Sequence, residues 1–365
     1  MKQTCYSEIL TDGNIQDYKN FFESCPNGLI QQSTYWSEII SPISPDASYF
    51  ILTRDSESNK ALAGLPLYFY QNHLGNILTS VPHAGPLGGV LILPDQEDDI
   101  KKHIYDQLLN KAINLAKDLN CIALTIITNP FINDVGYYTE AKKPGFIFEN
   151  FSQAIYLPEI FDKNDDLIIS QRNINRMLVK AEENGIKISA VASGEFDAWY
   201  QIHVQRHQDI NVTPLPYYLL KSIVSMLEPK DKGMLLVIKK DGKIIGGCIY
   251  IWHKEIADVF ILSSNSDYLK FGINHAITDF SLKFLHKKGV KWYNWQSSPR
   301  NSGVYEFKER WGSIEKPYYF LTWKLDGFDQ LYQYPVEKIK EEYQWHYLAP
   351  FQALTHKLLH GEFKK

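Results

Sequence analysis

The sequence predicts a mixed α/β protein with two similar domains in tandem and a cleft between them. At 365 residues the chain exceeds one ordinary hydrophobic core. One order of elements also appears twice: strand, tight turn, glycine-containing strand, strand, long helix, buried strand. Hairpins followed by a helical crossover give a mixed sheet with helices packed on it. A repeat of this length is typical of a duplicated domain.

The first copy lies between residues 49 and 128. Its apolar runs, separated by polar turns, predict strands at 49–54, 61–70 and 76–82. A long amphipathic pattern predicts a helix over about 98–120, and the apolar run at 121–128 predicts a buried strand.

The second copy lies between residues 234 and 296. It predicts strands at 234–239, 244–252 and 257–263, a helix over 271–288 that stops at Gly289, and a strand at 291–296.

A mostly helical stretch connects the copies, and an aromatic tail follows them. Helices are expected at 168–184, 195–207, 216–227 and 336–347, and a strand at 186–191. We therefore expect domains over residues 1–160 and 161–325. A helical extension over 326–365 is expected to pack back on them.

The composition is that of a globular protein, with 44% hydrophobic and 22% charged residues. A net charge of -4 gives no bulk attraction to nucleic acid or anionic membranes. The four cysteines show no paired spacing, which favours buried free thiols in a reducing compartment. We see neither a secretory signal nor an apolar run of the ~20 residues that a membrane span needs, and expect a cytoplasmic protein.

The segment at 303–312 is the most informative part of the chain. As a helix ended by Gly312, it places Val304, Phe307, Lys308 and Trp311 on one face. A lysine on an apolar face seldom lacks a partner, so we expect Lys308 to point into a cleft where a negative group meets it. Alternatively, Lys308 extends past the tryptophan to solvent.

A second cluster of cations lies on the helix at 168–184. Arg172, Arg176 and Lys180 stack at i, i+4 and i+8, opposite an apolar stripe. Three stacked cations suit a phosphate or diphosphate. The alternative is a solvated face, with Glu182 and Glu183 reducing its charge.

Two histidines, His203 and His207, have the i, i+4 spacing that can hold a metal on a helix. Val204 stands where the zinc-protease pattern needs Glu, and we expect no metal site. Arg206 and His207 instead extend the basic lining of a cleft. No nucleophilic elbow or kinase signature is present, which favours direct transfer between two bound substrates.

Three motifs carry a family resemblance. They are Gln171-Arg-Asn-Ile-Asn-Arg176 with the following Lys180 to Gly185, Gly246 after the Asp241-Gly242 turn, and Phe307-Lys308-x-x-Trp311-Gly312. Together they resemble the Fem-type aminoacyltransferases and their BioF2-like acyltransferase relatives, in the GNAT (N-acyltransferase) superfamily. The resemblance covers about residues 35–323.

The resemblance implies N-acyl transfer to an amine, without a tightly bound cofactor. The co-substrate is acyl-CoA such as acetyl-CoA, aminoacyl-tRNA or another acyl carrier. The acceptor is a small-molecule or nucleotide-linked amine, often a cell-envelope (peptidoglycan) precursor. Lys308 would stabilise the tetrahedral oxyanion, Tyr305 would protonate the leaving group, and Phe307 and Trp311 would contact substrate.

Two departures from the family pattern bear on the donor. The loop at 269–274 lies at the position where GNAT proteins hold the CoA diphosphate. The resemblance therefore implies that Lys270, Gly272 and Asn274 bind the diphosphate. Asn274 replaces a small residue there and crowds a close phosphate. The helical hairpin that some tRNA-dependent members insert is absent.

Two other function classes stay open. One is a non-catalytic GNAT-like binding or scaffold protein, and the other is a metal hydrolase that uses His203 and His207. The identity of the acceptor and the oligomeric state are open as well.

Overall fold

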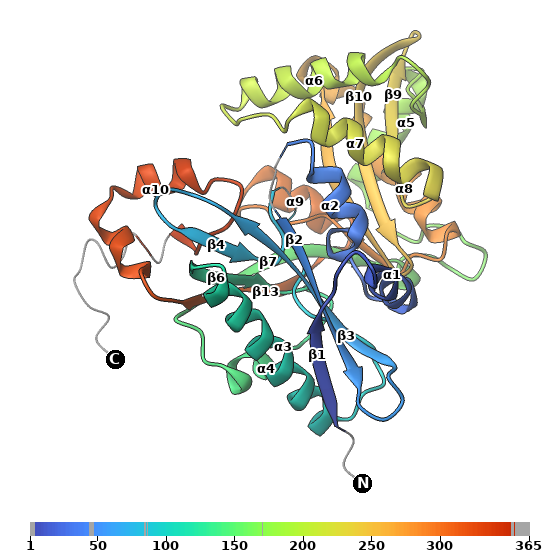
Figure 1. Ribbon diagram of the computed structural model, residues 1–365. Helices are drawn as coiled ribbons and strands as arrows, with labels where there is room; N and C mark the ends of the chain where they lie inside the picture. Colours follow the sequence, from blue (N-terminus) through green and yellow to red (C-terminus); the bar gives the residue numbers. More distant parts are fainter. Residues whose placement is uncertain are drawn as a thin grey trace. The chain divides into compact units, whose positions relative to one another are not determined.

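The computed structural model describes residues 4–43, 47–83, 85, 87–169, 171–351 and 354 (Figure 1). The chain is a mixed α/β protein that forms two compact units. Unit 1 comprises Met1–Ser37, Ser44–Asn150 and Pro317–Lys365, and unit 2 comprises Glu38–Ile43 and Phe151–Lys316.

The boundaries of these two units differ from the boundaries that we expected at residues 160 and 325. Strands β7 (Phe146–Tyr156) and β13 (Ile314–Lys324) each belong partly to one unit and partly to the other. The chain therefore changes unit inside two strands, where a sequence pattern gives no boundary signal. Of the expected extension at 326–365, residues 352, 353 and 355–365 lie outside the described residues.

Unit 1 is built on a sheet with the strand order β1-β2-β3-β4-β6-β13. β4 and β6 pair in parallel, and the other neighbours in this order pair antiparallel. The remaining short strand, β5, pairs with β3. The strands are β1 (Cys5–Ile9), β2 (Ala47–Asp55), β3 (Ala61–Tyr70), β4 (Asn76–Thr79), β5 (Leu91–Ile92) and β6 (Cys121–Ile127).

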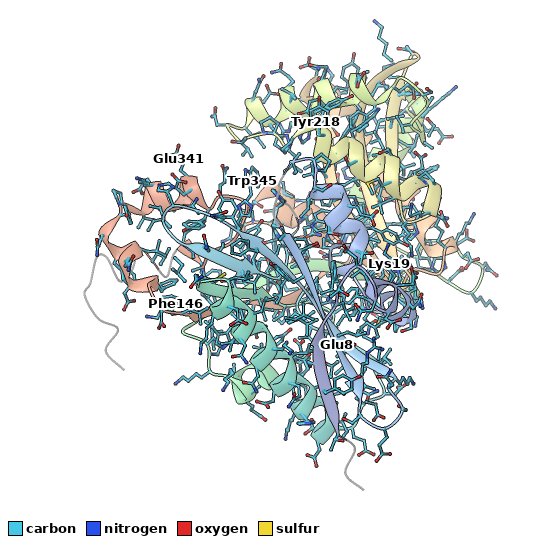
Figure 2. All side chains as sticks on the ribbon, viewed as in Figure 1. Glu8, Lys19, Phe146, Tyr218, Glu341 and Trp345 are labelled. Atoms are coloured by element: carbon cyan, nitrogen blue, oxygen red, sulfur yellow. The ribbon has the colours of Figure 1, made fainter. Side chains whose placement is uncertain are left out.

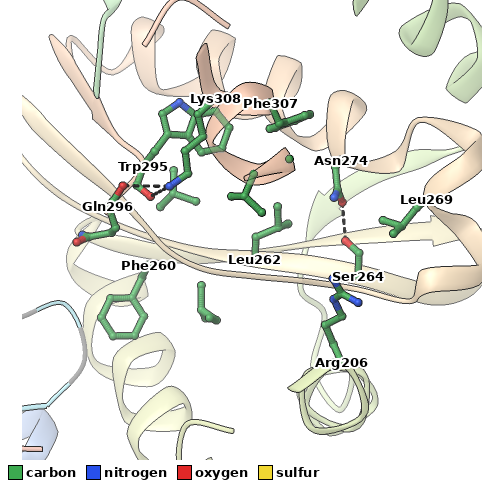
Figure 3. A pocket seen from close by; sticks show the side chains of 14 residues that line it. Arg206, Phe260, Leu262, Ser264, Leu269, Asn274, Trp295, Gln296, Phe307 and Lys308 are labelled. Atoms are coloured by element: carbon green, nitrogen blue, oxygen red, sulfur yellow. Dashed lines mark hydrogen bonds between the residues drawn. The ribbon is translucent and has the colours of Figure 1, made fainter. Parts of the chain in front are cut away.

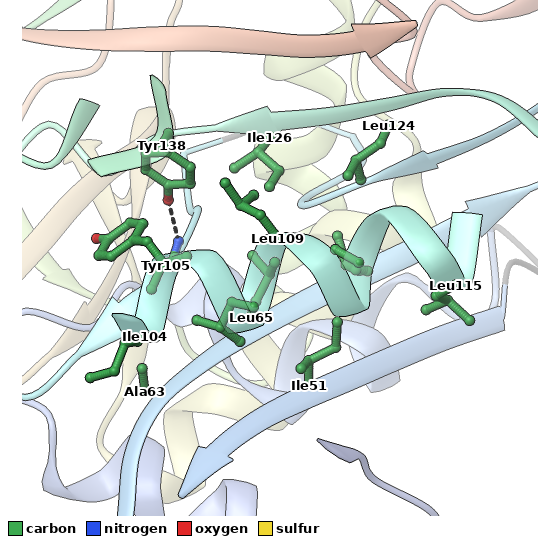
Figure 4. Close-up of a cluster of buried hydrophobic side chains, with 14 of the residues drawn as sticks. Ile51, Ala63, Leu65, Ile104, Tyr105, Leu109, Leu115, Leu124, Ile126 and Tyr138 are labelled. Atoms are coloured by element: carbon green, nitrogen blue, oxygen red, sulfur yellow. Dashed lines mark hydrogen bonds between the residues drawn. The ribbon is translucent and has the colours of Figure 1, made fainter. Parts of the chain in front are cut away.

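The helices of the amino-terminal part of the chain are α1 (Ile15–Ser24), α2 (Thr34–Ile40), α3 (Asp98–Asp118) and α4 (Val135–Ala141). The long helix α3 has the buried stripe that its sequence period predicts, including Ile104, Leu108 and Leu115. This stripe packs on Ile51, Leu65 and other strand residues in one hydrophobic cluster (Figure 4). The Tyr138 hydroxyl closes this core by accepting a 2.7 Å hydrogen bond from the Val90 backbone N–H.

Polar contacts tie the outer strands of unit 1 to their neighbours. The Arg54 guanidinium on β2 donates to Glu8 of β1 and to Asp17 of α1, both at 2.6 Å. Glu8 is labelled among the side chains in Figure 2. Arg54 is thus a buried arginine that has two carboxylate partners.

The carboxyl-terminal segment packs on the core of unit 1. It contains a short 3-10 helix at Phe328–Gln333 and α10 (Val336–Glu342). Phe328, Leu331 and Ile339 join a cluster with Leu74 and Ile122. The helix that we predicted at 336–347 ends earlier, at Glu342.

Unit 2 contains the second copy of the repeated elements, in the strand order β7-β12-β11-β10-β9-β8. The strands are β8 (Lys187–Ala190), β9 (Gly233–Lys240), β10 (Lys243–His253), β11 (Ile256–Ser264) and β12 (Trp292–Asn294). The helices are α5 (Arg172–Glu183), α6 (Phe196–Asp209), α7 (Tyr217–Leu227), α8 (Ile273–Lys287) and α9 (Gly303–Arg310).

Helices cover both faces of this sheet. A Cβ on Gly247 of β10 would meet the Trp199 ring of α6 at 2.7 Å. The next residue, Cys248, belongs to a cluster with Ile277 and Leu282 of α8. Because neighbouring strand residues face opposite ways, α6 and α8 lie on opposite faces.

All four cysteines are free and buried, as their spacing predicted. Within the part of the chain that the structure describes, no helix combines the length and the hydropathy that crossing a membrane requires.

Candidate active site

A cavity of about 460 Å³ lies in unit 2 beside strand β11 (Figure 3). Its lining comes from β11, from the start of α8, from the chain after β12, and from α9 and α6. The lining residues are Arg206, Val259, Phe260, Ile261, Leu262, Ser264, Leu269, Asn274, Trp295, Gln296, Gly303, Val304, Phe307 and Lys308.

The cavity forms where two parallel strands separate. β11 pairs with β12 only over Ile256–Asp258, because β12 ends at Asn294 while β11 continues to Ser264. The register between β10 and β11 also shifts, which leaves Phe260 as the extra residue of a β-bulge. A bulge bends its strand and increases the local twist. The edge of β11 beyond Asp258 therefore forms one wall of the cavity.

A buried polar network fixes the end of β12. The Asn294 amide donates to Asp258 on β11 at 2.6 Å, and its oxygen accepts from the Gln296 backbone N–H at 3.2 Å. The same oxygen accepts from the Ser152 hydroxyl of β7. After this anchor, Gln296 has a left-handed backbone with φ 62°. Such a conformation is uncommon for a residue other than glycine and turns the chain sharply.

Lys308 reaches into this turn from α9. Ser302 caps the amino terminus of this helix, and its hydroxyl accepts from the Tyr305 backbone N–H at 3.1 Å. The Lys308 ammonium donates to the carbonyl oxygens of Trp295 and Gln296, at 2.9 and 3.0 Å. Lys308 is only 5% exposed, so its side chain does not extend past Trp311 to solvent, which was the alternative prediction.

The electrostatic environment of Lys308 is unusual. No carboxylate of the described residues lies within ion-pair distance of it, and burial lowers the pKa of Lys308 to about 8. A lysine ammonium has three N–H donors, and two of them are taken by backbone carbonyls. One donor and an unbalanced positive charge are thus left for a group in the cavity.

The neighbours of Lys308 on α9 have different surroundings. Phe307 lines the cavity, whereas Trp311 is fully buried in the hydrophobic core of unit 2. Tyr305 lies outside the cavity lining, and its hydroxyl donates to Glu315 at 3.0 Å. This carboxylate raises the pKa of Tyr305. The structure therefore does not bring Tyr305 and Lys308 to the same cavity.

Arg206 of α6 also lines the cavity, on the other side of β11 from Lys308 (Figure 3). The adjacent His207 is buried and does not line it; its Nδ1 lies 2.9 Å from the His203 carbonyl oxygen. Both ring nitrogens of His203 are in use, with Ser263 and with the Leu215 N–H. The described residues hold no cluster of three metal-ligating side chains. Both histidines are thus hydrogen-bonded within unit 2.

The basic helix does not contribute to this cavity. Arg172, Arg176 and Lys180 are exposed on α5, and none of them lines it. The apolar stripe of α5 is buried through Ile174 and Ala181, as its period predicted. A binding role for the three cations stays a prediction, at a place separate from the Lys308 cavity.

The loop at 269–274 is shaped by contacts within the protein. Gly272 has φ 76°, and a Cβ there would overlap the backbone carbonyl of Met177 in α5. The Asn274 amide oxygen accepts from the Ser264 hydroxyl at 2.6 Å, and Lys270 lies 5.2 Å from the Phe271 ring. Of the three residues expected to hold a diphosphate, only Asn274 lines the cavity.

Sequence reasoning missed the residues that make the Lys308 environment. These are Trp295 and Gln296, which act through their carbonyls, and Asn294, which anchors them. The available signal was the pair of polar residues inside the aromatic run at 291–296. Backbone carbonyls leave no trace in a sequence, so their role needed the structure.

Comparisons with known proteins agree with this architecture. Residues 170–309 match the family model described as "Acetyltransferase (GNAT) domain". No protein with a curated description matches the sequence.

Several solved structures share the fold. FemX has a TM-score of 0.69 at 14% identity, over 89% of this chain and 99% of that chain. A tandem GNAT protein from the clavulanic acid biosynthesis pathway has a TM-score of 0.52 at 12% identity, over 88% and 98%. The C-terminal domain of a putative lysylphosphatidylglycerol synthetase from Agrobacterium fabrum has a TM-score of 0.54 at 12% identity, over 87% of this chain and 93% of that chain. Residues 170–309 thus match a GNAT acetyltransferase domain, and the fold of the chain is that of FemX and of a tandem GNAT protein.

Proposed function

We propose that this protein is an N-acyltransferase that moves an acyl group from a carrier to an amine in the Lys308 cavity of unit 2. The observation that carries the proposal is the buried Lys308 ammonium. It lines a cavity, has no acidic partner among the described residues and keeps one free N–H donor. Such a group stabilises negative charge that develops on a ligand.

The reaction needs that stabilisation at one atom. A neutral amine nitrogen attacks the carbonyl carbon of the donor, and the carbonyl oxygen becomes an oxyanion. The new C–N bond forms, the C–S or C–O bond to the carrier breaks, and the nitrogen's proton goes to the leaving group. Lys308 is held in place by two carbonyls, so it needs little reorganisation when the oxyanion forms.

The cavity lining favours direct transfer. It contains no cysteine, histidine or carboxylate among its described residues, and the hydroxyl of Ser264 donates to Asn274. The lining thus lacks both an activated nucleophile and a general base. The amine must enter the cavity as its free base and attack the donor itself.

The donor and the acceptor follow from the family resemblance. The donor is acyl-CoA, aminoacyl-tRNA or another acyl carrier, and the acceptor is a small or nucleotide-linked amine, with a cell-envelope precursor as one candidate. A catalytic role also accounts for a buried charge at position 308. In a non-catalytic scaffold, an apolar side chain at this place would avoid the cost of a buried charge without an acid.

The test is titration of the purified protein with acetyl-CoA and free CoA, followed by transfer assays with CoA and aminoacyl-tRNA donors. We expect a donor to bind and to turn over with an amine. Lys308→Met should lower turnover by about 10²–10³, the usual cost of losing one oxyanion donor. Lys283→Met is the control, because Lys283 lies on α8 outside the cavity and pairs with Asp279.

Two results would contradict the proposal. Near wild-type turnover in Lys308→Met would remove Lys308 from the chemistry. Saturable donor binding without transfer to any amine would favour the scaffold alternative.

A further inference from the structure

The walls of the Lys308 cavity are mainly apolar. Strand β11 contributes four consecutive residues, Val259 to Leu262, and α9 contributes Val304 and Phe307. Leu269 and the Trp295 ring add to this surface. The close-up shows the Leu262 and Phe307 side chains near the Lys308 end of the cavity (Figure 3). Apolar walls gain free energy when they bury apolar ligand surface.

Several polar groups of the lining are satisfied within the protein, whereas the side-chain N–H groups of Trp295 and Gln296 have no hydrogen-bond partner among the described residues. Ser264 and Asn274 bond each other, and two of the three Lys308 donors go to carbonyls. The remaining charged groups are the Lys308 ammonium and the Arg206 guanidinium, both positive. The described lining has no Asp or Glu.

A cationic ligand group would therefore be unfavourable here. The α-ammonium of an aminoacyl group lies two bonds from the carbonyl carbon, so it would stay close to Lys308. It would lose part of its hydration, meet a like charge and find no acid to pair with. An uncharged chain in the same place meets mainly apolar side chains.

We infer that the transferred acyl group is an uncharged apolar chain and that aminoacyl groups are disfavoured. This inference rests on the proposed function and narrows its donor to acyl carriers without an α-ammonium. The acyl carbonyl lies at Lys308, and the chain lies along β11 against Leu262 and Phe307.

The test uses the full-length protein and thioesters of N-acetylcysteamine, which carry no charge of their own. Propionyl and alanyl thioesters are a matched pair that differ in the α-ammonium, and the octanoyl thioester extends the chain. Binding is followed by calorimetry and by tryptophan fluorescence, since Trp295 lines the cavity. We expect propionyl to bind more tightly than alanyl. Affinity should rise about fourfold for each further methylene that the cavity buries.

A charge introduced into the wall should reverse this preference. Val304 lines the cavity and is 58% exposed, so Val304→Asp should fold normally. The new carboxylate should strengthen alanyl binding and weaken octanoyl binding. The control is Val179→Asp, at a valine of α5 that is 53% exposed and outside the lining; it should leave both affinities unchanged.

The outcomes separate this inference from the proposed function. Alanyl transfer that is as fast as propionyl transfer, or alanyl binding that is as tight, overturns the inference and leaves an N-acyltransferase. If Val304→Asp still binds propionyl and alanyl thioesters with the wild-type preference, the inference is also overturned, because the acyl chain would then lie elsewhere. Tight octanoyl binding without turnover supports the inference and contradicts the proposed function.

Discussion

Lys308 shows how a single residue can be both costly to the fold and suited to a reaction. Burial without an acid removes much of its hydration, and two backbone carbonyls replace only part of it. The resulting pKa of about 8 keeps Lys308 mostly charged at neutral pH. A buried charge of this kind is more often part of a site than of a stabilising network.

The first prediction concerns pH. Lys308 is charged below its pKa of about 8 and loses its proton above it, so kcat/KM should fall as pH rises past about 8. In Lys308→Arg this descending limb should disappear, whatever the absolute rate, because a guanidinium stays charged. The measurement is the pH profile of kcat/KM for both proteins. An identical descending limb in Lys308→Arg would assign the titration to another group.

The same shift has a consequence for stability. The folded protein binds the Lys308 proton less tightly than the unfolded chain, whose lysine titrates near the ordinary 10.5. The contribution of this residue to the free energy of unfolding should therefore rise between about pH 8 and 10.5. Urea unfolding of the wild type and of Lys308→Arg at both pH values measures it. If the free energy of unfolding changed equally with pH in both proteins, Lys308 would not be the group responsible.

At the scale of elements, the contact between α5 and α8 determines the conformation of the loop at 269–274. Gly272 begins α8 in a left-handed conformation and touches the Met177 backbone of α5. The family resemblance implied that Gly272 belongs to a loop that holds a diphosphate, although Asn274 crowds a close phosphate there. In the structure, helix α5 of the same chain is the close neighbour of Gly272. Packing between α5 and α8 therefore explains why this position needs a glycine.

This contact predicts unequal effects of two similar substitutions. Gly272 and Gly289 both have positive φ, at 76° and 79°, but only Gly272 has a neighbour in the path of a Cβ. Gly289→Ala should cost about 1–2 kcal/mol of backbone strain. Gly272→Ala should cost about 1–3 kcal/mol more, because α5 must also shift. Chemical denaturation of both variants measures the difference, and equal losses would show that the α5 contact is not tight.

At the scale of the whole molecule, each unit has a hydrophobic core of its own. Unit 1 combines segments from both ends of the chain, since Phe328 and Leu331 pack with Leu74 and Ile122. The cavity lining lies entirely in unit 2. The candidate site and the cluster formed by the carboxyl-terminal segment therefore lie in different units.

This distribution predicts a local effect of a core mutation. Phe328 is 1% exposed in the cluster of the carboxyl-terminal segment, and Phe328→Ala should cost about 3–5 kcal/mol. Hydrogen exchange should show the loss of protection in β4 and β6, with less change in β9 and β10. An equal loss in β9 and β10 would mean that the two units unfold as one.

The sequence by itself determined the order of elements within the two repeated copies and their approximate bounds, but β1, β7 and β13 were not predicted. The predicted strand at 61–70 is β3, and the predicted helix at 98–120 is α3, two residues shorter. These predictions succeeded because hydrophobic period and turn residues are local properties of the chain. The face shared by Phe307 and Lys308 followed from helical spacing in the same way.

Only the tertiary structure decided what surrounds Lys308. The cavity exists because β12 ends at Asn294 while β11 continues, a difference in length between strands that meet through long-range pairing. The partners of Lys308 are carbonyls whose direction depends on the backbone of Gln296. Tyr305, three residues before Lys308, points to Glu315 instead. Spacing along a helix fixes which residues share a face, but what that face meets depends on packing between distant segments.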